Sequence, residues 1–220
     1  MAPLPVTPEF PMDKEYWSNY YATHREVDKP SLFARYLVED QRVCDGYSLI
    51  ELGCGNGRDS TYFHRQGLEV TGVDQVQEQI DYLSRIYANT VGLNFRCADF
   101  TRLQGEETYG VVYSRFTLHS VSREQQLRVV GWAYEHLATG GLFCIEVRGK
   151  KNELFQRGAR VPGDPDAYIH DGHYRRFLDY GRFLEQLEEV GFTIVYSAEQ
   201  KGFAPFGNTD ETFIRVIASK

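Results

Sequence analysis

The sequence predicts one α/β domain built on a mostly parallel sheet of seven strands, with helices on both faces. Short apolar runs alternate with segments of helical periodicity from residue 47 onward. Three glycines, Gly53, Gly55 and Gly57, follow the first apolar run at every second position. Only a loop, over 201–210, separates the last two apolar runs, which predicts an antiparallel hairpin at the end of the sheet.

Each expected element has a local signal. A helix over 13–24 is expected to begin at Asp13, and a helix over 30–42 at Pro30 and Ser31, because these residue types favour helix N-termini. The strands are short apolar runs, expected at 47–52, 69–73, 94–98, 109–114, 142–147, 192–199 and 212–218. Glycines end three of the remaining helices, which are expected at 58–66, 75–88, 122–137 and 180–190.

Length and composition limit the function classes. A chain of 220 residues with 42% hydrophobic and 25% charged residues suits one soluble domain. The net charge of −7 argues against a non-specific grip on nucleic acid, and no apolar run reaches the ~20 residues of a membrane span. We expect neither nucleic acid nor a membrane as partner, and a protein that is a monomer or a homodimer.

The chain is expected to divide into two parts. Residues 1–29 contain several prolines and then a cluster of aromatic residues, so they are expected to form a loose leader and a lid helix. Residues 30–220 are expected to form the α/β domain, with an irregular insertion at about 148–178 between the fifth strand and the next helix.

The cysteines and paired histidines give weak metal signals. No Cys-x-x-Cys pair occurs among the four cysteines, Cys44, Cys54, Cys97 and Cys144. We therefore expect reduced thiols in a cytoplasmic protein. His170 and His173 have a spacing that a metal pair can use, but this spacing alone is common, so no metal site is expected.

The segment from Glu51 to Gly57 carries the strongest functional signal. It joins the first expected strand to a helix, and the second strand ends at Asp74, 23 positions after Glu51. A strand, a glycine turn, a helix and a second strand that ends in an acid hold a ribose-bearing cofactor at the edge of a parallel sheet. Glycines let the backbone approach the ligand, and a carboxylate can accept hydrogen bonds from both ribose hydroxyls. Nicotinamide enzymes instead show Gly-x-Gly-x-x-Gly with a helix N-terminus facing a pyrophosphate.

Glu51–Gly57, Asp74 and the pair Asp99-Phe100 resemble the first, second and third motifs of the class I S-adenosylmethionine-dependent methyltransferases. The strand order with its terminal hairpin resembles the Rossmann-like fold of that family, over about residues 30–220. The resemblance implies S-adenosylmethionine as cofactor and S-adenosylhomocysteine as product. It also implies that Asp99 holds the adenine amino group and that Phe100 contacts the ring. The expected cofactor-binding residues are Glu51, Gly53, Cys54, Gly55, Asn56, Gly57, Asp74, Gln75, Asp99, Phe100, Arg115, Trp17 and Tyr21.

The end of the fourth strand supplies the candidate catalytic residues. Chemistry in such folds takes place at the carboxyl ends of the strands, and Arg115 and His119 follow the fourth strand. His119 is expected to be the general base, since the pKa of free histidine lies near neutrality. Arg115 is expected to orient an anionic acceptor. The alternatives are a structural ion pair for Arg115 and, for His119, a histidine bonded to the backbone at a helix start.

The segment from Arg148 to Arg176 departs from the charge of the chain. It holds seven basic and four acidic residues, a net +3 in a chain of −7. A cationic, aromatic loop over the site favours an acceptor that bears a carboxylate or phosphate, and the alternative is a solvated loop. The expected acceptor-binding residues are Tyr20, Arg148, His170, His173, Tyr174, Arg175 and Arg176.

These observations lead to one functional hypothesis and two rivals. The hypothesis is transfer of a methyl group from S-adenosylmethionine to a hydroxyl, or as second choice an amine, of a small or glycan-like acceptor, with an anionic acceptor as one option. Local motifs after the fourth strand and near the C-terminus resemble small-molecule and glycan-modifying bacterial methyltransferases of the class. The rivals are a nicotinamide-dependent oxidoreductase and a non-catalytic cofactor-binding protein of the same fold.

Overall fold

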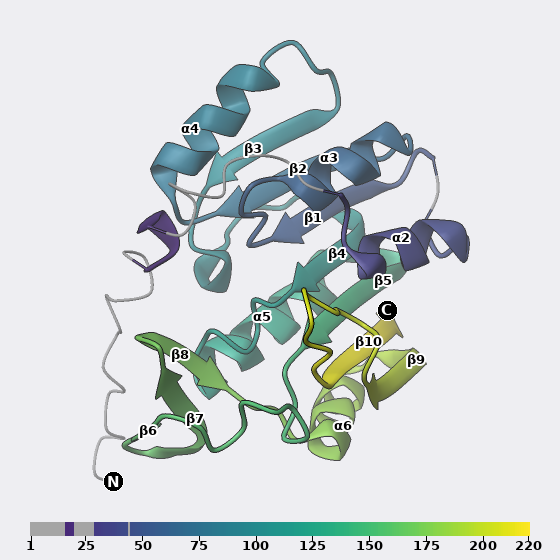
Figure 1. The fold of residues 1–220 in the computed structure, drawn as a ribbon. Coiled ribbons are helices and arrows are strands. Elements are labelled where there is room, and N and C mark those ends of the chain that lie inside the picture. The colour runs from purple at the N-terminus through teal and green to yellow at the C-terminus, as the bar shows by residue number, and fades with distance from the viewer. Residues whose placement is uncertain (1–15, 20–28, 44) are drawn as a thin grey trace, which may run out of the picture.

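A central sheet of seven strands organises the chain, as the computed structural model in Figure 1 shows for residues 16–19, 29–43 and 45–220. The strand order is β3-β2-β1-β4-β5-β10-β9. The first five of these pair in parallel, and β10 runs antiparallel to both β5 and β9. The predicted mostly parallel sheet with an antiparallel terminal hairpin is confirmed. Its strands are β1 Ser48–Leu52, β2 Glu69–Asp74, β3 Leu93–Cys97, β4 Tyr109–Arg115, β5 Leu137–Val147, β9 Thr193–Gln200 and β10 Phe213–Ser219.

Helices cover both faces of this sheet, also as predicted (Figure 1). The elements are α2 Leu32–Glu39, α3 Arg58–Arg65, α4 Gln77–Ile86, α5 Arg123–His136, α6 Tyr180–Val190 and a short 3-10 helix η1, Phe100–Arg102. Phe33 of α2 and Phe63 of α3 pack on one face, and Val129 of α5 and Phe183 of α6 pack on the other. Ser122 begins α5 with a capping box, because its side chain accepts from the backbone of Gln125 and the Gln125 side chain bonds back.

The strands divide their side chains between two cores with the period of two expected for buried parallel strands. Leu49 and Val111 belong to the core beneath α2 and α3, whereas Ile50 and Val112 belong to the core beneath α5 and α6. Because β1 pairs in parallel with both β2 and β4, the carboxyl ends of these three strands meet at one edge of the sheet, where the candidate site lies. No helix in the described part of the chain has the length and apolar character needed to span a bilayer.

The insertion after β5 folds differently from the irregular segment that was expected. It contains a second sheet of three antiparallel strands, β6 Ala159–Val161, β7 Asp164–His170 and β8 His173–Arg176, which lies apart from the main sheet and beside α5 (Figure 1). Asp171 and Gly172 join β7 to β8, with φ of +52° and +72°. Asp-Gly is a strong signal for such a two-residue hairpin turn. That signal is present in the sequence, and the prediction of an irregular segment was wrong.

Several expected boundaries also shift. β5 starts at Leu137 directly after α5, rather than at Leu142, and α4 spans only 77–86 of the expected 75–88. Of the expected N-terminal helix, residues 16–19 are helical, and the remainder lies outside the described residues. The division into a 1–29 leader and a 30–220 domain stays a prediction.

Candidate functional site

The glycine loop forms a bare backbone surface at the carboxyl end of β1. Gly53, Gly55 and Gly57 have φ of +74°, +53° and +73°, the left-handed region that favours glycine. A Cβ atom at Gly53 would lie 2.3 Å from the Cγ2 atom of Thr117, so a side chain has no room there. The amides of Gly53 and its successor both donate to the carbonyl of Val73, at 2.8 and 2.9 Å. The loop is therefore tied to the end of β2.

The Asp74 carboxylate is hydrogen-bonded to the backbone of this loop. Its Oδ2 accepts from the amide of Gly55 at 3.0 Å, and its Oδ1 accepts from the amide of Val76 at 3.0 Å. Burial raises the pKa of Asp74, and these backbone donors act in the opposite direction without cancelling the rise. The carboxylate lines the cleft above the loop and has further acceptor capacity for a ligand. The sequence indicated a ligand contact at Asp74, and the structure adds the support of the loop.

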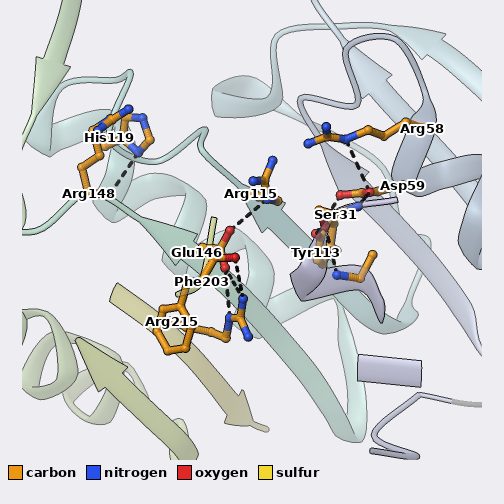
Figure 2. A network of polar contacts seen from close by, with 11 residues as sticks. Ser31, Arg58, Asp59, Tyr113, Arg115, His119, Glu146, Arg148, Phe203 and Arg215 are labelled. Carbon is orange, nitrogen blue, oxygen red and sulfur yellow. Dashed lines mark hydrogen bonds and ion pairs between the residues drawn. The ribbon is translucent and has the colours of Figure 1, made fainter. Parts of the chain in front are cut away.

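Two further carboxylates lie over the N-terminus of α3. Glu51 is 5% exposed and accepts from the Ser60 hydroxyl, and Asp59 accepts from the amide of Ser31 at 2.7 Å and from the Tyr113 hydroxyl at 2.9 Å (Figure 2). Burial, and then the charge of Asp59, raise the pKa of Glu51 well above its usual value. A helix N-terminus normally attracts phosphate, but acids at this position repel it. The site therefore suits a cationic group better than a pyrophosphate.

A cleft of about 1950 Å³ opens above the loop. Its volume exceeds the ~300–1,000 Å³ of a typical small-ligand pocket, so it has room for two ligands side by side. Most expected cofactor-binding residues line it: Glu51, Gly53, Cys54, Gly55, Asn56, Asp74, Gln75, Asp99, Phe100, Arg115 and Trp17. Gly57 is an exception, because it caps α3 and a Cβ there would meet Leu83 and Phe95 at 3.1 Å. Tyr21 lies outside the described residues.

Arg115 forms the structural ion pair that was one alternative and also lines the cleft, and its role toward an anionic acceptor stays a prediction. Its guanidinium lines the cleft, and its Nε donates to the buried Glu146 at 2.9 Å (Figure 2). The guanidinium carbon also lies 3.9 Å from the ring centroid of Phe116. Burial is the largest cause and lowers the pKa of Arg115. The charge and hydrogen bond of Glu146, together with Tyr113 and Asp59, outweigh burial, and the pKa is raised. Arg115 is thus a fixed cation at the cleft wall.

His119 is placed poorly for proton abstraction. It is 4% exposed and is not among the residues that line the cleft. Its Nδ1 accepts from the amide of Arg148 at 3.2 Å, so in the neutral ring the proton sits on Nε2. Burial, and then the charge of Arg148, lower the pKa of His119 well below its usual value. The backbone-bonded alternative describes this geometry better than the general base does.

The expected acceptor residues separate into two groups. Tyr174 and Arg176 line the cleft, whereas Arg148, His170, His173 and Arg175 do not. The last four contact the protein itself: Arg148 pairs with Glu211, His170 with Asp171, Arg175 donates to the His170 carbonyl, and His173 stacks on Tyr16 with ring centroids 4.6 Å apart. Tyr20 lies outside the described residues. Within the described ranges, no three His, Cys, Asp or Glu side chains gather as metal ligands.

Several basic side chains of the insertion form ion pairs with acidic neighbours. Lys150 lies 3.0 Å from Asp166, Lys151 lies 2.9 Å from Glu199, and the Nε of Arg176 lies 3.5 Å from the carboxylate of Asp164. Arg157 and Arg160 remain exposed, so part of the net +3 of the segment faces solvent away from these pairs.

A group of polar side chains from α5, α6 and β8, here called the polar floor, lines the far part of the cleft and was not predicted from the sequence. Arg176 donates through Nη1 to Gln126 of α5, and Gln126 donates to Gln186 of α6 at 3.4 Å. Gln126 is 1% exposed and Gln186 is 8% exposed, yet both line the cleft together with Asp164. A glutamine within an amphipathic helix gives no signal that separates it from an ordinary surface residue. Only the packing of α5, α6 and β8 reveals this floor.

Together, the fold and the acid-lined glycine loop define a Rossmann-like protein of the methyltransferase type. Residues 49–141 match the family model described as a methyltransferase domain. This match, the relatives and the shared fold support a class I S-adenosylmethionine-dependent methyltransferase.

Relatives of known name fall in the same class. The ubiquinone biosynthesis O-methyltransferase of Rickettsia felis is 28% identical over 144 residues, which are 64% of this chain and 55% of the relative. The malonyl-[acyl-carrier protein] O-methyltransferase of Bacillus cereus is 30% identical over 142 residues, 62% of this chain and 50% of the relative. The chain thus spans about half the length of these relatives.

A solved structure shows the same fold over the whole chain. The 1,6-didemethyltoxoflavin-N1-methyltransferase of Burkholderia thailandensis, with 1,6-didemethyltoxoflavin and S-adenosylhomocysteine bound, superimposes with a TM-score of 0.73 at 20% identity. The match covers 100% of this chain and 92% of that one.

Proposed function

We propose that this protein transfers the methyl group of S-adenosylmethionine to a hydroxyl of a small or glycan-like acceptor, with an amine as second choice. The observation that carries the proposal is the group of three buried acids, Glu51, Asp59 and Asp74, around a loop that presents the bare backbone of Gly53 and Gly55 to the cleft. The names of the R. felis and B. cereus relatives, both O-methyltransferases, support an oxygen atom as the methyl acceptor.

The cleft residues fit the proposed cofactor. Asp74 would accept from the ribose hydroxyls, Asp99 would hold the adenine amino group, and Phe100 would contact the ring. Asp99 lies at the cleft edge, where one of its carboxylate oxygens accepts from the amide of Thr101 at 2.8 Å. The Glu51 carboxylate favours a nearby positive charge. When bound, the cofactor would supply a methyl group activated by a positively charged sulfur.

The acceptor is proposed to occupy the far part of the cleft, beside Tyr174, Arg176 and Gln126. These side chains offer hydrogen-bond donors and acceptors rather than an unpaired charge, which favours a hydroxyl-rich or heterocyclic acceptor over a strongly anionic one. Holding the acceptor oxygen in line with the methyl group is itself a large part of such catalysis. We propose that His119 supports the loop around Arg115 and that a group on the cleft wall, such as Tyr174 or Asp164, takes the acceptor proton.

Calorimetry tests the proposal most simply. S-adenosylmethionine and S-adenosylhomocysteine should each bind at one site per chain, and NAD(P)H should give no heat. Binding of NAD(P)H instead would favour the oxidoreductase. Binding of S-adenosylhomocysteine without turnover on a broad panel of hydroxyl and amine acceptors would favour the non-catalytic alternative. The cytoplasmic location and the monomeric or dimeric state stay predictions.

A further inference from the structure

Three charged side chains form a row across the main sheet at its carboxyl edge. Arg115 of β4 is paired in register with Glu146 of β5, and Glu146 is paired in register with Arg215 of β10. Residues directly opposite one another in neighbouring strands share a face of the sheet. Figure 2 shows the two guanidinium groups on either side of the Glu146 carboxylate.

The row is deeply buried on the side away from the cleft. Glu146 is 0% exposed and accepts from Arg115 Nε at 2.9 Å and from Arg215 at 2.9 and 2.6 Å. Arg215 is 4% exposed and does not line the cleft. Its guanidinium carbon lies 4.0 Å from the ring centroid of Phe203 and 4.6 Å from that of Phe33, so aromatic faces enclose the cation.

The charges of the row do not cancel. Two guanidinium groups share one carboxylate, which leaves one positive charge within the row. The buried carboxylate of Asp59 lies near enough to favour the charge of Arg115, but no hydrogen bond joins the two side chains among the described residues. Arg115 is the member that reaches the cleft, with a side chain 13% exposed. Among the residues that the structure describes, its two terminal nitrogens donate no hydrogen bond. Their paired N–H groups are the edge that grips a carboxylate with two parallel bonds.

The backbone conformation next to Arg115 also supports a ligand site. Phe116 has a φ of +62°, an uncommon conformation for a residue with a bulky side chain. Its amide donates to the carbonyl of Glu146 at 2.8 Å, and its ring stacks on Phe213 with centroids 4.7 Å apart. This arrangement fixes the aromatic face on which the Arg115 guanidinium rests. Strained backbone of this kind concentrates at ligand sites.

We propose that the row binds a carboxylate at Arg115, and that Arg215 is a positioning residue that keeps this end of the row cationic. Without Arg215, Arg115 and Glu146 would form a neutral pair and the attraction for an anion would vanish. The inference rests on the proposed function, because that function supplies two sources of a carboxylate: the amino-acid end of the cofactor, or a carboxylate on the acceptor.

The test compares ligands with and without a carboxylate. S-adenosylhomocysteine carries one, and 5′-methylthioadenosine has the same nucleoside without it. Arg215→Gln removes the cation while keeping a donor for Glu146, and Arg215→Lys keeps the cation. The exposed Arg35, which pairs with Glu39 on α2, supplies the control Arg35→Gln. Thermal unfolding identifies the variants that are folded, and calorimetry measures both affinities. A second arm compares 4-hydroxybenzoate with phenol on protein saturated with S-adenosylhomocysteine.

We expect Arg215→Gln to weaken the affinity for S-adenosylhomocysteine on the order of tenfold, as for loss of a charge-assisted contact. The affinity for 5′-methylthioadenosine should stay unchanged. Arg215→Lys should retain wild-type affinity, and Arg215→Gln should have no further effect in an Arg115→Gln background. If only the preference for 4-hydroxybenzoate over phenol is lost, the acceptor supplies the carboxylate.

Several results would overturn the inference. One is an equal loss of affinity for S-adenosylhomocysteine and 5′-methylthioadenosine in Arg215→Gln. Another is additive loss of affinity when Arg215→Gln is combined with Arg115→Gln. The third is a variant that keeps the wild-type preference both for S-adenosylhomocysteine over 5′-methylthioadenosine and for 4-hydroxybenzoate over phenol. A wild-type protein that binds neither nucleoside would reject the proposed function itself. A wild-type protein that binds both nucleosides equally and also shows no preference for 4-hydroxybenzoate over phenol would reject the inference alone.

Discussion

Replacement of Asp74 by alanine probes the cofactor site at the residue on which the glycine loop depends. The change removes the acceptor of two backbone N–H groups, those of Gly55 and Val76, each 3.0 Å from a carboxylate oxygen. Asp74 is 7% exposed, so water replaces these bonds poorly. Both folding and cofactor binding should therefore suffer.

The size of each effect follows from the contacts. Hydrogen bonds to a charged group contribute roughly 1.5–3 kcal/mol each. The raised pKa of Asp74 shows that burial of its charge offsets part of this gain, so we expect a net loss of about 2 kcal/mol in the free energy of unfolding. Loss of one charged hydrogen bond to the ribose alone should weaken S-adenosylhomocysteine by about tenfold or more.

Calorimetry with S-adenosylhomocysteine and urea unfolding measure the two effects separately. The matched control is Asp81→Ala, which removes an exposed carboxylate on α4 that accepts a hydrogen bond from Gln77 at 2.7 Å. It should change neither quantity appreciably. A folded Asp74→Ala variant with wild-type affinity would remove Asp74 from the cofactor site and refute the reasoning.

Three other substitutions test separate parts of the site. Gly53→Ala should abolish S-adenosylhomocysteine binding, because the added Cβ would lie 2.3 Å from Thr117 Cγ2. Adding Thr117→Ser removes this clash and should restore part of the affinity. If no affinity returns, the loss comes from the positive φ of residue 53 and not from the clash. His119→Asn should lower turnover by less than about tenfold. A loss of ~10²-fold would instead support His119 as the general base. The folded state lowers the pKa of His119, so it binds fewer protons than the unfolded state below the usual value of about 6.5. The wild type should therefore lose stability as the pH falls through that range, and His119→Asn should lose less; equal losses in pH-dependent unfolding would contradict this. Arg176→Met should raise the acceptor KM and leave cofactor affinity unchanged, and a change in calorimetric affinity for S-adenosylhomocysteine would contradict it.

Local signals explain why the cofactor half of the cleft was predictable. The glycine loop and Asp74 lie at the ends of consecutive strands, and the parallel sheet brings such ends together whatever the details of packing. The exception, Gly57, serves the packing of α3 rather than the cleft, because glycines needed for backbone conformation and for ligand approach look alike in sequence.

The acceptor half depends on contacts between distant segments. Glu146 lies 31 positions from Arg115 and 69 from Arg215, so the row exists only through the register of three strands. The orientation of His119 is set by the amide of Arg148, 29 positions away. Neither relation leaves a pattern in the local sequence, and the charge of the insertion could not show which cations were already paired.

A crystal structure of the protein with S-adenosylhomocysteine tests the central claim most directly. The account predicts the nucleoside above Gly53 and Gly55, with its ribose hydroxyls within hydrogen-bond distance of Asp74. Electron density for the ligand at another surface, or a loop whose own side chains occupy this space, would contradict it.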